Sequence, residues 1–183
     1  MKRTLTLIAL LLLALAPSAR ALTNEENPAS VQLVAAQIAH DGTPILAGLV
    51  FRLEPGWKTY WRNPGDSGIA PTFDWGRSEN IRSIELRWPA PKRFHIADET
   101  IFGYQNEVVL PLLVRALDPA KPVQLRLKLE YAVCSTLCVP LKAELALIMP
   151  AGKPEPSQDA ALIRHYLSLV PVDDAIEVKR HLP

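Results

Sequence analysis

Seventeen prolines are spread along this chain of 183 residues, and they constrain the fold more than any other feature. Proline removes a backbone donor and breaks a helix interior, so the spacing leaves little room for long helices. Short strands joined by turns are favoured instead. Hydrophobic residues make up 49% of the chain and the net charge is only +1. A disordered chain would have fewer apolar residues and a larger net charge, so this one is expected to fold, and its length suits one domain.

The charge distribution excludes one class of partner. The chain carries 20 basic and 19 acidic residues and has no basic block. Recognition of nucleic acid begins with a cationic face. No nucleic-acid partner is therefore expected.

The N-terminus has the pattern of a secretory signal peptide over residues 1–21. Lys2 and Arg3 precede the apolar run Leu7–Ala16, and Ala19-Arg20-Ala21 matches a small-x-small cleavage site. The run is too short to cross a bilayer, which needs about 20 residues, although an uncleaved anchor is the alternative. No later segment has 18 consecutive apolar residues, so the mature chain is expected to be soluble. Export would place its cysteines in an oxidising compartment, where a disulfide can persist.

Alternation of apolar and polar residues predicts a sheet protein. In Val123–Val133 every second side chain is apolar and those between are mostly polar, which is the pattern of a half-buried strand. The other predicted strands are Val31–His40, Ile45–Leu53, Ile81–Trp88, Glu107–Ala116 and Lys142–Met149. Pro111 inside one of them indicates an edge strand or a bulge. Six short strands separated by Pro/Gly turns predict an all-β fold, an antiparallel two-sheet sandwich.

The composition changes after Pro150. Residues 151–156 are typical of a linker, Ser157 is a candidate helix cap, and the apolar spacing that follows predicts a short helix over 158–169. We expect this C-terminal helix to pack on the sandwich, and a partner-binding helix is the alternative. The chain is thus divided into a signal peptide at 1–21, a domain at 22–150, and a linker, helix and tail at 151–183.

Cys134 and Cys138, the only cysteines, lie at the end of the clearest strand with three residues between them. In an exported protein such a pair forms a disulfide or binds metal. Zinc needs about four ligands and the four histidines are scattered, while copper held by both cysteines and a distant histidine remains an alternative. A structural disulfide closing so short a loop would contribute only about 2 kcal/mol, and a domain of this size can bury a core without it. A redox-active pair is therefore favoured over a structural one.

Two further groups carry weaker signals. The aromatic residues could form a carbohydrate platform, although in a sandwich they more often belong to the core. They are Trp57, Tyr60, Trp61, Trp75 and Trp88. Asp98 and Glu99 could act as a carboxylate pair in hydrolysis, but adjacent residues of a strand point to opposite faces.

Three motifs occur in an order that resembles a known family. They are Gly56-Trp57-Lys58-Thr59-Tyr60-Trp61-Arg62-Asn63-Pro64-Gly65-Asp66-Ser67-Gly68, then Phe102-Gly103-Tyr104 with Glu107 and Leu110-Pro111, then Val133-Cys134 to Cys138-Val139-Pro140. The chain resembles the periplasmic N-terminal domain of the DsbD family of thiol:disulfide interchange proteins. Within that family it is most similar to the ScsB-like branch, which is linked to copper tolerance.

The resemblance implies an immunoglobulin-like sandwich in the periplasm whose redox pair, Cys134 and Cys138, needs no cofactor. A membrane-embedded DsbD-like donor would reduce the pair, which would then reduce thioredoxin-like proteins, disulfide isomerases or cytochrome c maturation proteins. It also implies a cap loop over the cysteines. Its residues would be Asp98, Glu99, Phe102 and Tyr104, with Phe102 as the main shield.

We expect thiol–disulfide exchange in which Cys138 attacks, because a loop at a strand end exposes its second cysteine more readily. No Lys or Arg lies between the cysteines, and Lys142 is the nearest base in sequence. Activation of the thiolate is therefore expected from the fold or from a docked partner. The alternatives are a non-redox binding module with a structural disulfide, and a copper-tolerance protein that binds Cu(I) through the reduced cysteines. No membrane-spanning conduit is expected in this chain, so it would collect electrons from a separate membrane protein or else work without that route.

Overall fold

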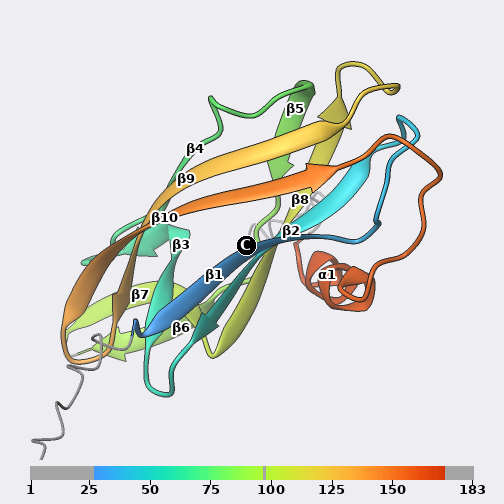
Figure 1. Ribbon diagram of the computed structural model, residues 1–183. Helices are drawn as coiled ribbons and strands as arrows, with labels where there is room; N and C mark the ends of the chain where they lie inside the picture. The colour runs from blue at the N-terminus through green and yellow to red at the C-terminus, as the bar shows by residue number, and fades with distance from the viewer. Residues whose placement is uncertain (1–26, 97, 172–183) are drawn as a thin grey trace, which may run out of the picture.

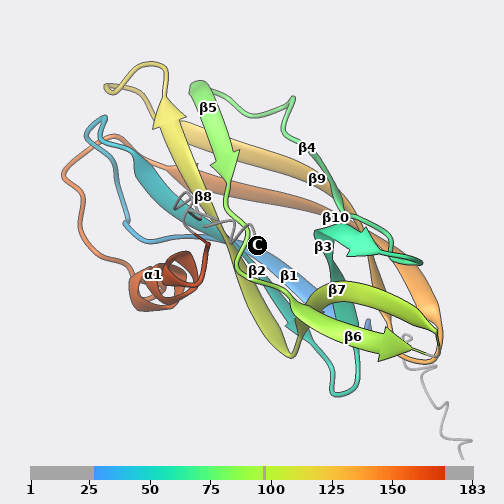
Figure 2. The ribbon, with the colours of Figure 1, turned by 180° about the vertical axis from the view of Figure 1, so that it is seen from behind.

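The alternating segments pair into two antiparallel sheets in a computed structural model that describes residues 27–96 and 98–171. The signal peptide expected at 1–21 and most of the tail lie outside these residues. The first sheet has the order β1 (Ala29–Ala35), β2 (Ile45–Leu53), β8 (Glu107–Ala116), β5 (Ile81–Leu86). The second has the order β10 (Cys138–Met149), β9 (Val123–Cys134), β3 (Lys58–Gly65), β7 (Glu99–Gln105), β6 (Lys92–Ile96), and β4 (Thr72–Asp74) also pairs with β9. Figures 1 and 2 show the two layers from opposite sides.

The core lies between the inward faces of the sheets. Leu125, Leu127 and Leu129 of β9 are fully buried, as the alternation predicts, and they belong to one cluster with the inward side chains of β2 and β8. Phe51 of β2 meets Tyr131 of β9 edge to face, with ring centroids 5.5 Å apart. The expected all-β immunoglobulin-like sandwich is confirmed.

One expectation about the sheet is wrong. Pro111 indicated an edge strand or a bulge, but β8 lies inside the first sheet, between β2 and β5. The Pro111 carbonyl accepts a hydrogen bond from the backbone N–H of Arg87, just after β5 ends at Leu86. The nitrogen and the carbonyl of a strand residue point to the same side, so the missing N–H of Pro111 falls where its neighbouring strand stops.

Other strands differ from their predicted lengths. β1 ends at Ala35 rather than at His40, and β10 already begins at Cys138 rather than at Lys142. β3 formed no part of the prediction because its segment ends in Asn63-Pro64-Gly65, which is typical of a turn. β4, β6 and β7 were not predicted either.

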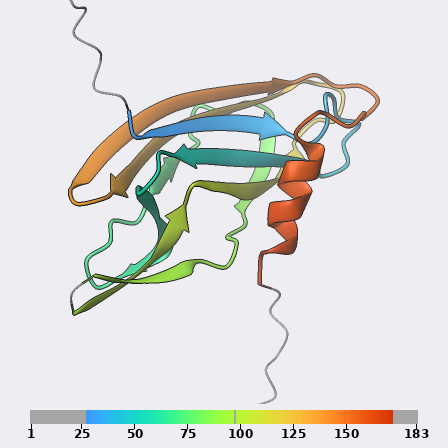
Figure 3. The same ribbon diagram turned by 90° about the horizontal axis from the view of Figure 1, so that it is seen from below.

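The expected C-terminal helix is present as α1 (Ala160–Ser168) and packs on the outer face of the first sheet. Ile163 is fully buried there against Val50 and Val109. Ser157 is not the N-cap; Asp159 holds that position, and the Ser157 hydroxyl accepts from the Asp159 N–H and donates to the Ala35 carbonyl. Figure 3 shows α1 at the opposite end of the molecule from the β9–β10 turn. Among the described residues no helix is long and apolar enough to cross a membrane.

Candidate redox site at the β9–β10 turn

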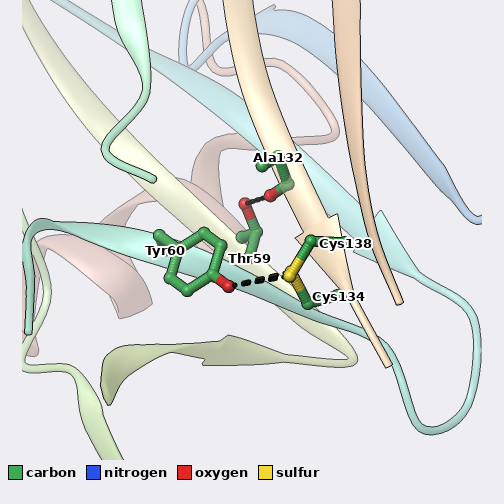
Figure 4. Close-up of a disulfide and its surroundings, with 5 residues drawn as sticks. All are labelled: Thr59, Tyr60, Ala132, Cys134 and Cys138. Atoms are coloured by element: carbon green, nitrogen blue, oxygen red, sulfur yellow. Dashed lines mark hydrogen bonds between the residues drawn. A yellow bond between two sulfur atoms is a disulfide. The ribbon is translucent and has the colours of Figure 1, made fainter. Parts of the chain in front are cut away.

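The two cysteines face each other across the end of a hairpin. β9 ends at Cys134, β10 begins at Cys138, and the antiparallel register pairs these two residues directly. Their sulfurs form a disulfide (Figure 4). The three residues of the turn include Leu137, whose side chain is 75% exposed. The disulfide therefore lies at a tip of the molecule that a partner can reach.

The two cysteines differ in burial. Cys134 is 3% exposed, whereas Cys138 is exposed. Alternation assigned Cys134 to the polar face of its strand, where Arg126, Lys128 and Glu130 are indeed exposed. At this end, however, that face is covered by a second small cluster, formed by Tyr60, Ile101, Ala132 and Cys134. Of the two cysteines, Cys138 is thus the residue more accessible to solvent.

Tyr60 of β3 contacts both sulfurs. Its hydroxyl oxygen lies 2.8 Å from Sγ of Cys134 and 3.3 Å from Sγ of Cys138. Figure 4 shows the hydroxyl pointing to the disulfide. A disulfide has no hydrogen to give, so the phenol is the donor. Burial, and then the negative charge of Glu99, raise the pKa of Tyr60 above its ordinary value of 10.0. Tyr60 therefore keeps its proton and remains a donor at neutral pH.

Close packing of β3 against its neighbours holds Tyr60 in place. Gly103 of β7 lies opposite Tyr60, and a Cβ added to it would come within 2.1 Å of the Thr59 carbonyl oxygen. Thr59 is buried, and its hydroxyl donates to the Ala132 carbonyl of β9 over 3.0 Å. These contacts fix the ring of Tyr60 beside the hairpin end.

A lysine that lies far away in sequence is close to the pair in the structure. Lys58 of β3 is opposite Cys134 in the register, and its ammonium lies 5.6 Å from the ring centroid of Phe94. Lys142, the nearest base in sequence, forms an ion pair with Glu130 at 2.5 Å, which offsets its charge. Among the described residues Lys58 has no ion pair, so its positive charge favours a thiolate on this face.

The residues expected to form the cap are not brought together over the disulfide. Ile101 belongs to the cluster around Cys134, and strand alternation puts Phe102 and Tyr104 on the other face of β7. Phe102 packs edge to face on Trp61, and the Tyr104 hydroxyl donates to the Pro89 carbonyl over 2.8 Å. Neither of these contacts is with the disulfide, so the shielding role of Phe102 and Tyr104 stays a prediction.

Asp98 and Glu99 lie exposed where β7 begins. Glu99 is close enough to raise the pKa of Tyr60, so one of the two acids belongs to the surroundings of the disulfide. The cap roles of Asp98 and Glu99 stay predictions.

The structure gives little support to the two alternative sites, the aromatic carbohydrate platform and the metal site. Trp57, Trp61, Trp75 and Trp88 all pack against the main core, whereas Tyr60 belongs to the cluster at the disulfide, so the five aromatics do not form one platform. Within the part of the chain that the structure describes, no three histidine, cysteine, aspartate or glutamate side chains are grouped to hold a metal ion. A copper site would therefore have to rely on the two cysteines.

Tyr60 and Lys58 are the residues that sequence reasoning missed as parts of the site. Both lie about 75 positions before the cysteines, and their segment was read as an aromatic cluster followed by a turn. The pairing of β3 with β9 is what brings them to the sulfurs.

The chain is similar to known proteins over most of the described residues. The family model described as "Thiol:disulfide interchange protein DsbD, N-terminal" matches residues 28–150. The crystal structure of the N-terminal periplasmic domain of ScsB from Proteus mirabilis is similar, with 28% identity and a TM-score of 0.64 over 81% of this chain and 56% of that one. The DsbD N-terminal domain of Neisseria meningitidis in the reduced form matches at 17% identity and a TM-score of 0.42, over 75% of this chain and 96% of that one. No curated protein matches. The chain spans little more than half of the ScsB structure.

Proposed function

The chain belongs to the family of DsbD N-terminal domains, and from this premise we propose that it is a periplasmic electron carrier that reduces disulfides in partner proteins through Cys134 and Cys138. One observation carries the proposal. An exposed residue, Cys138, is bonded through its sulfur to a buried residue, Cys134, and a tyrosine hydroxyl donates to both sulfurs. This arrangement separates an attacking thiol from a resolving thiol.

The exchange proceeds in two steps from the reduced domain. The thiolate of Cys138 attacks one sulfur of the partner's disulfide; that bond breaks, a mixed disulfide forms, and the partner's other sulfur leaves as a thiolate that takes up a proton. The Cys134 thiolate then attacks Sγ of Cys138, which restores the Cys134–Cys138 disulfide and releases the partner's second thiol. Two electrons and two protons pass to the partner. A protein dithiol reduces the domain by the reverse steps.

Two neighbours would assist these steps. The Tyr60 hydroxyl donates to a sulfur that is neutral in the disulfide and negatively charged as a thiolate, and hydrogen bonds to charged acceptors are the stronger ones. Lys58 adds a positive charge on the same face. Both interactions lower the free energy of a thiolate at Cys134, the sulfur that leaves when the domain is reduced.

The partners follow from the chemistry of the pair. The electron donor would be a membrane-embedded protein of the DsbD type, and the acceptors would be periplasmic thioredoxin-like or disulfide isomerase proteins. The related ScsB structure is of a periplasmic domain, which supports the same compartment here.

The reduction potential of the pair tests the proposal. Equilibration with a glutathione series should give a value between about −270 and −120 mV, the range from thioredoxin to a strongly oxidising carrier. A value below about −300 mV would indicate a structural disulfide, and a non-redox binding module would then explain the fold better.

Two variants test the division of labour between the cysteines. Cys134→Ser keeps the exposed attacking thiol and lacks the resolving one, so it should accumulate a mixed disulfide with an oxidised thioredoxin-like protein. Cys138→Ser keeps only the buried thiol and should accumulate little. Equal trapping by both variants would contradict the assignment of Cys138 as the attacking cysteine.

A further inference from the structure

A pocket of ≈ 280 Å³ opens along the β9–β10 hairpin, and the lining residue nearest in sequence to the disulfide is Pro140. Its lining includes Ile69, Ala70 and Thr72 from the chain between β3 and β4 and the start of β4, Glu130 from β9, and Pro140 and Lys142 from β10. Pro140 follows Cys138 by two residues on β10, so it points to the same face of the sheet about 7 Å further along. The pocket therefore begins within reach of a chain that is attached to Cys138.

The loop between β3 and β4 fixes the pocket relative to the sulfurs. The loop leaves β3 at Gly65, which pairs with Ile101 of β7, and enters β4 at Thr72, which pairs with Glu130 of β9. A Cβ added to Gly68 would lie 2.8 Å from the ring of Tyr60, which shows how closely the loop lies on that side chain. Tyr60 contacts both sulfurs, and Ile69, the next residue of the loop, lines the pocket.

The chemistry of the walls selects an apolar group. Ile69, Ala70 and Pro140 contribute hydrocarbon, and Ile69 is 49% exposed with nothing packed over it in the described part of the chain. The charged residues at the rim, Glu130 and Lys142, neutralise each other in their 2.5 Å ion pair. The pocket thus has no uncompensated charge that would attract an acidic or basic side chain.

We propose that this pocket receives an aliphatic side chain of the partner protein, two residues from the partner's reacting cysteine, while the mixed disulfide with Cys138 exists. The inference rests on the proposed function. A mixed disulfide holds the partner's chain at Cys138, and in an extended chain the residue two positions away points to the same side as the cysteine. That spacing of about 7 Å matches the step from Cys138 to Pro140.

Labelled peptides provide the test. Two short peptides carry a cysteine linked to thionitrobenzoate and differ only two residues away, where one has leucine and the other serine. The Cys138 thiolate of the reduced chain attacks the peptide sulfur, that disulfide bond breaks, and coloured thionitrobenzoate leaves; Cys134 then releases the peptide as a thiol. The leucine peptide should react about tenfold faster, because part of its side chain leaves water.

Surface variants locate the effect. Ile69→Ser, which removes the hydrocarbon wall, and Ala70→Trp, which fills the pocket, should bring the leucine-to-serine ratio close to one. Ile148→Ser is the matched control, because Ile148 is also an exposed isoleucine, at 64%, and lies on the same face of β10 away from the pocket. It should keep the tenfold ratio.

The outcomes separate the two proposals. If the reduced chain fails to exchange even with glutathione disulfide, the proposed function itself is wrong. If it exchanges with both peptides at equal rates, only the pocket proposal is overturned. If Ile69→Ser instead changes the oligomeric state in size-exclusion chromatography and leaves the ratio intact, the pocket is a contact between copies of the chain, and the proposal is also overturned.

Discussion

Replacement of Tyr60 by phenylalanine should slow the reduction of the disulfide while the fold is retained. The hydroxyl of Tyr60 lies 2.8 Å from Sγ of Cys134, and Phe keeps the ring that packs in the cluster around that sulfur. When a small dithiol attacks the exposed Cys138, Cys134 leaves as a thiolate, and its charge builds up in front of the Tyr60 O–H. The substitution removes this donor and little else.

The size of the effect follows from the charge on the sulfur. A hydrogen bond to a charged group contributes about 1.5–3 kcal/mol, and about half of the charge has developed in the transition state. A loss of about 0.7–1.5 kcal/mol corresponds to a rate about three- to tenfold lower. In the fully reduced protein the same loss should raise the pKa of the Cys134 thiol by about one to two units.

The assay is reduction of the oxidised domain by excess dithiothreitol, stopped at intervals with an alkylating reagent and resolved by mass. Tyr104→Phe is the matched control, since Tyr104 is an equally buried tyrosine whose hydroxyl donates to the Pro89 carbonyl rather than to sulfur. It should lower stability and leave the rate unchanged. A Tyr60→Phe rate within twofold of the wild-type rate, or equal slowing in both variants, would refute the argument.

Three further predictions concern the packing around the site and the sheets. Gly103→Ala puts a Cβ 2.1 Å from the Thr59 carbonyl oxygen, so it should weaken the pairing of β3 with β7 and lower the urea midpoint. It should also alter the exchange rate, because Tyr60 is displaced. An unchanged urea midpoint would contradict this prediction. Ile163→Ala leaves a cavity between α1 and the first sheet and should lower the free energy of unfolding in urea by about 2–5 kcal/mol. Exchange kinetics should not change, because α1 lies at the opposite end of the molecule from the disulfide. Burial raises the pKa of Tyr104 and of Tyr131 above 10.0 in the folded state. Their contribution to stability is therefore complete below about pH 10 and falls as the pH rises further, since the unfolded chain releases those protons first. Urea midpoints measured from pH 8 to pH 11 should stay level and then fall, and a rise above pH 10 would contradict the prediction.

The elements that the sequence predicted are those in which one face is buried along the whole length. β2 and β8 have the bounds that the apolar runs indicated, and β9 extends its alternating segment by one residue. β3, β6 and β7 were not predicted, because their burial depends on pairing with distant strands. In β6, for example, Lys92, Arg93 and His95 are all exposed, so the segment has no periodic apolar face that would predict a strand.

The site divides in the same way. The spacing and position of Cys134 and Cys138 identified the pair, because a cysteine pair at a strand end is a local pattern. Tyr60 was not identifiable, since its contact with the sulfurs depends on two long-range facts, the pairing of β3 with β9 and the glycine at position 103. The burial of Cys134 was not predicted for a related reason. Ile101, which packs in the same cluster, belongs to β7, a strand that alternation did not predict.

The geometry of the hairpin also explains why the domain can lose and regain its disulfide. Cys134 and Cys138 form the last of twelve paired positions along β9 and β10, and the inward side chains of β9 hold that strand against the core. The register is therefore set by the other eleven pairs and by burial, not by the covalent bond. Reduction removes a loop constraint of only about 2 kcal/mol from a hairpin that is already fixed. We therefore expect the two thiols to stay opposite each other after reduction, with Tyr60 beside them, so the proposed resolving attack of Cys134 on Cys138 would require no rearrangement of the backbone.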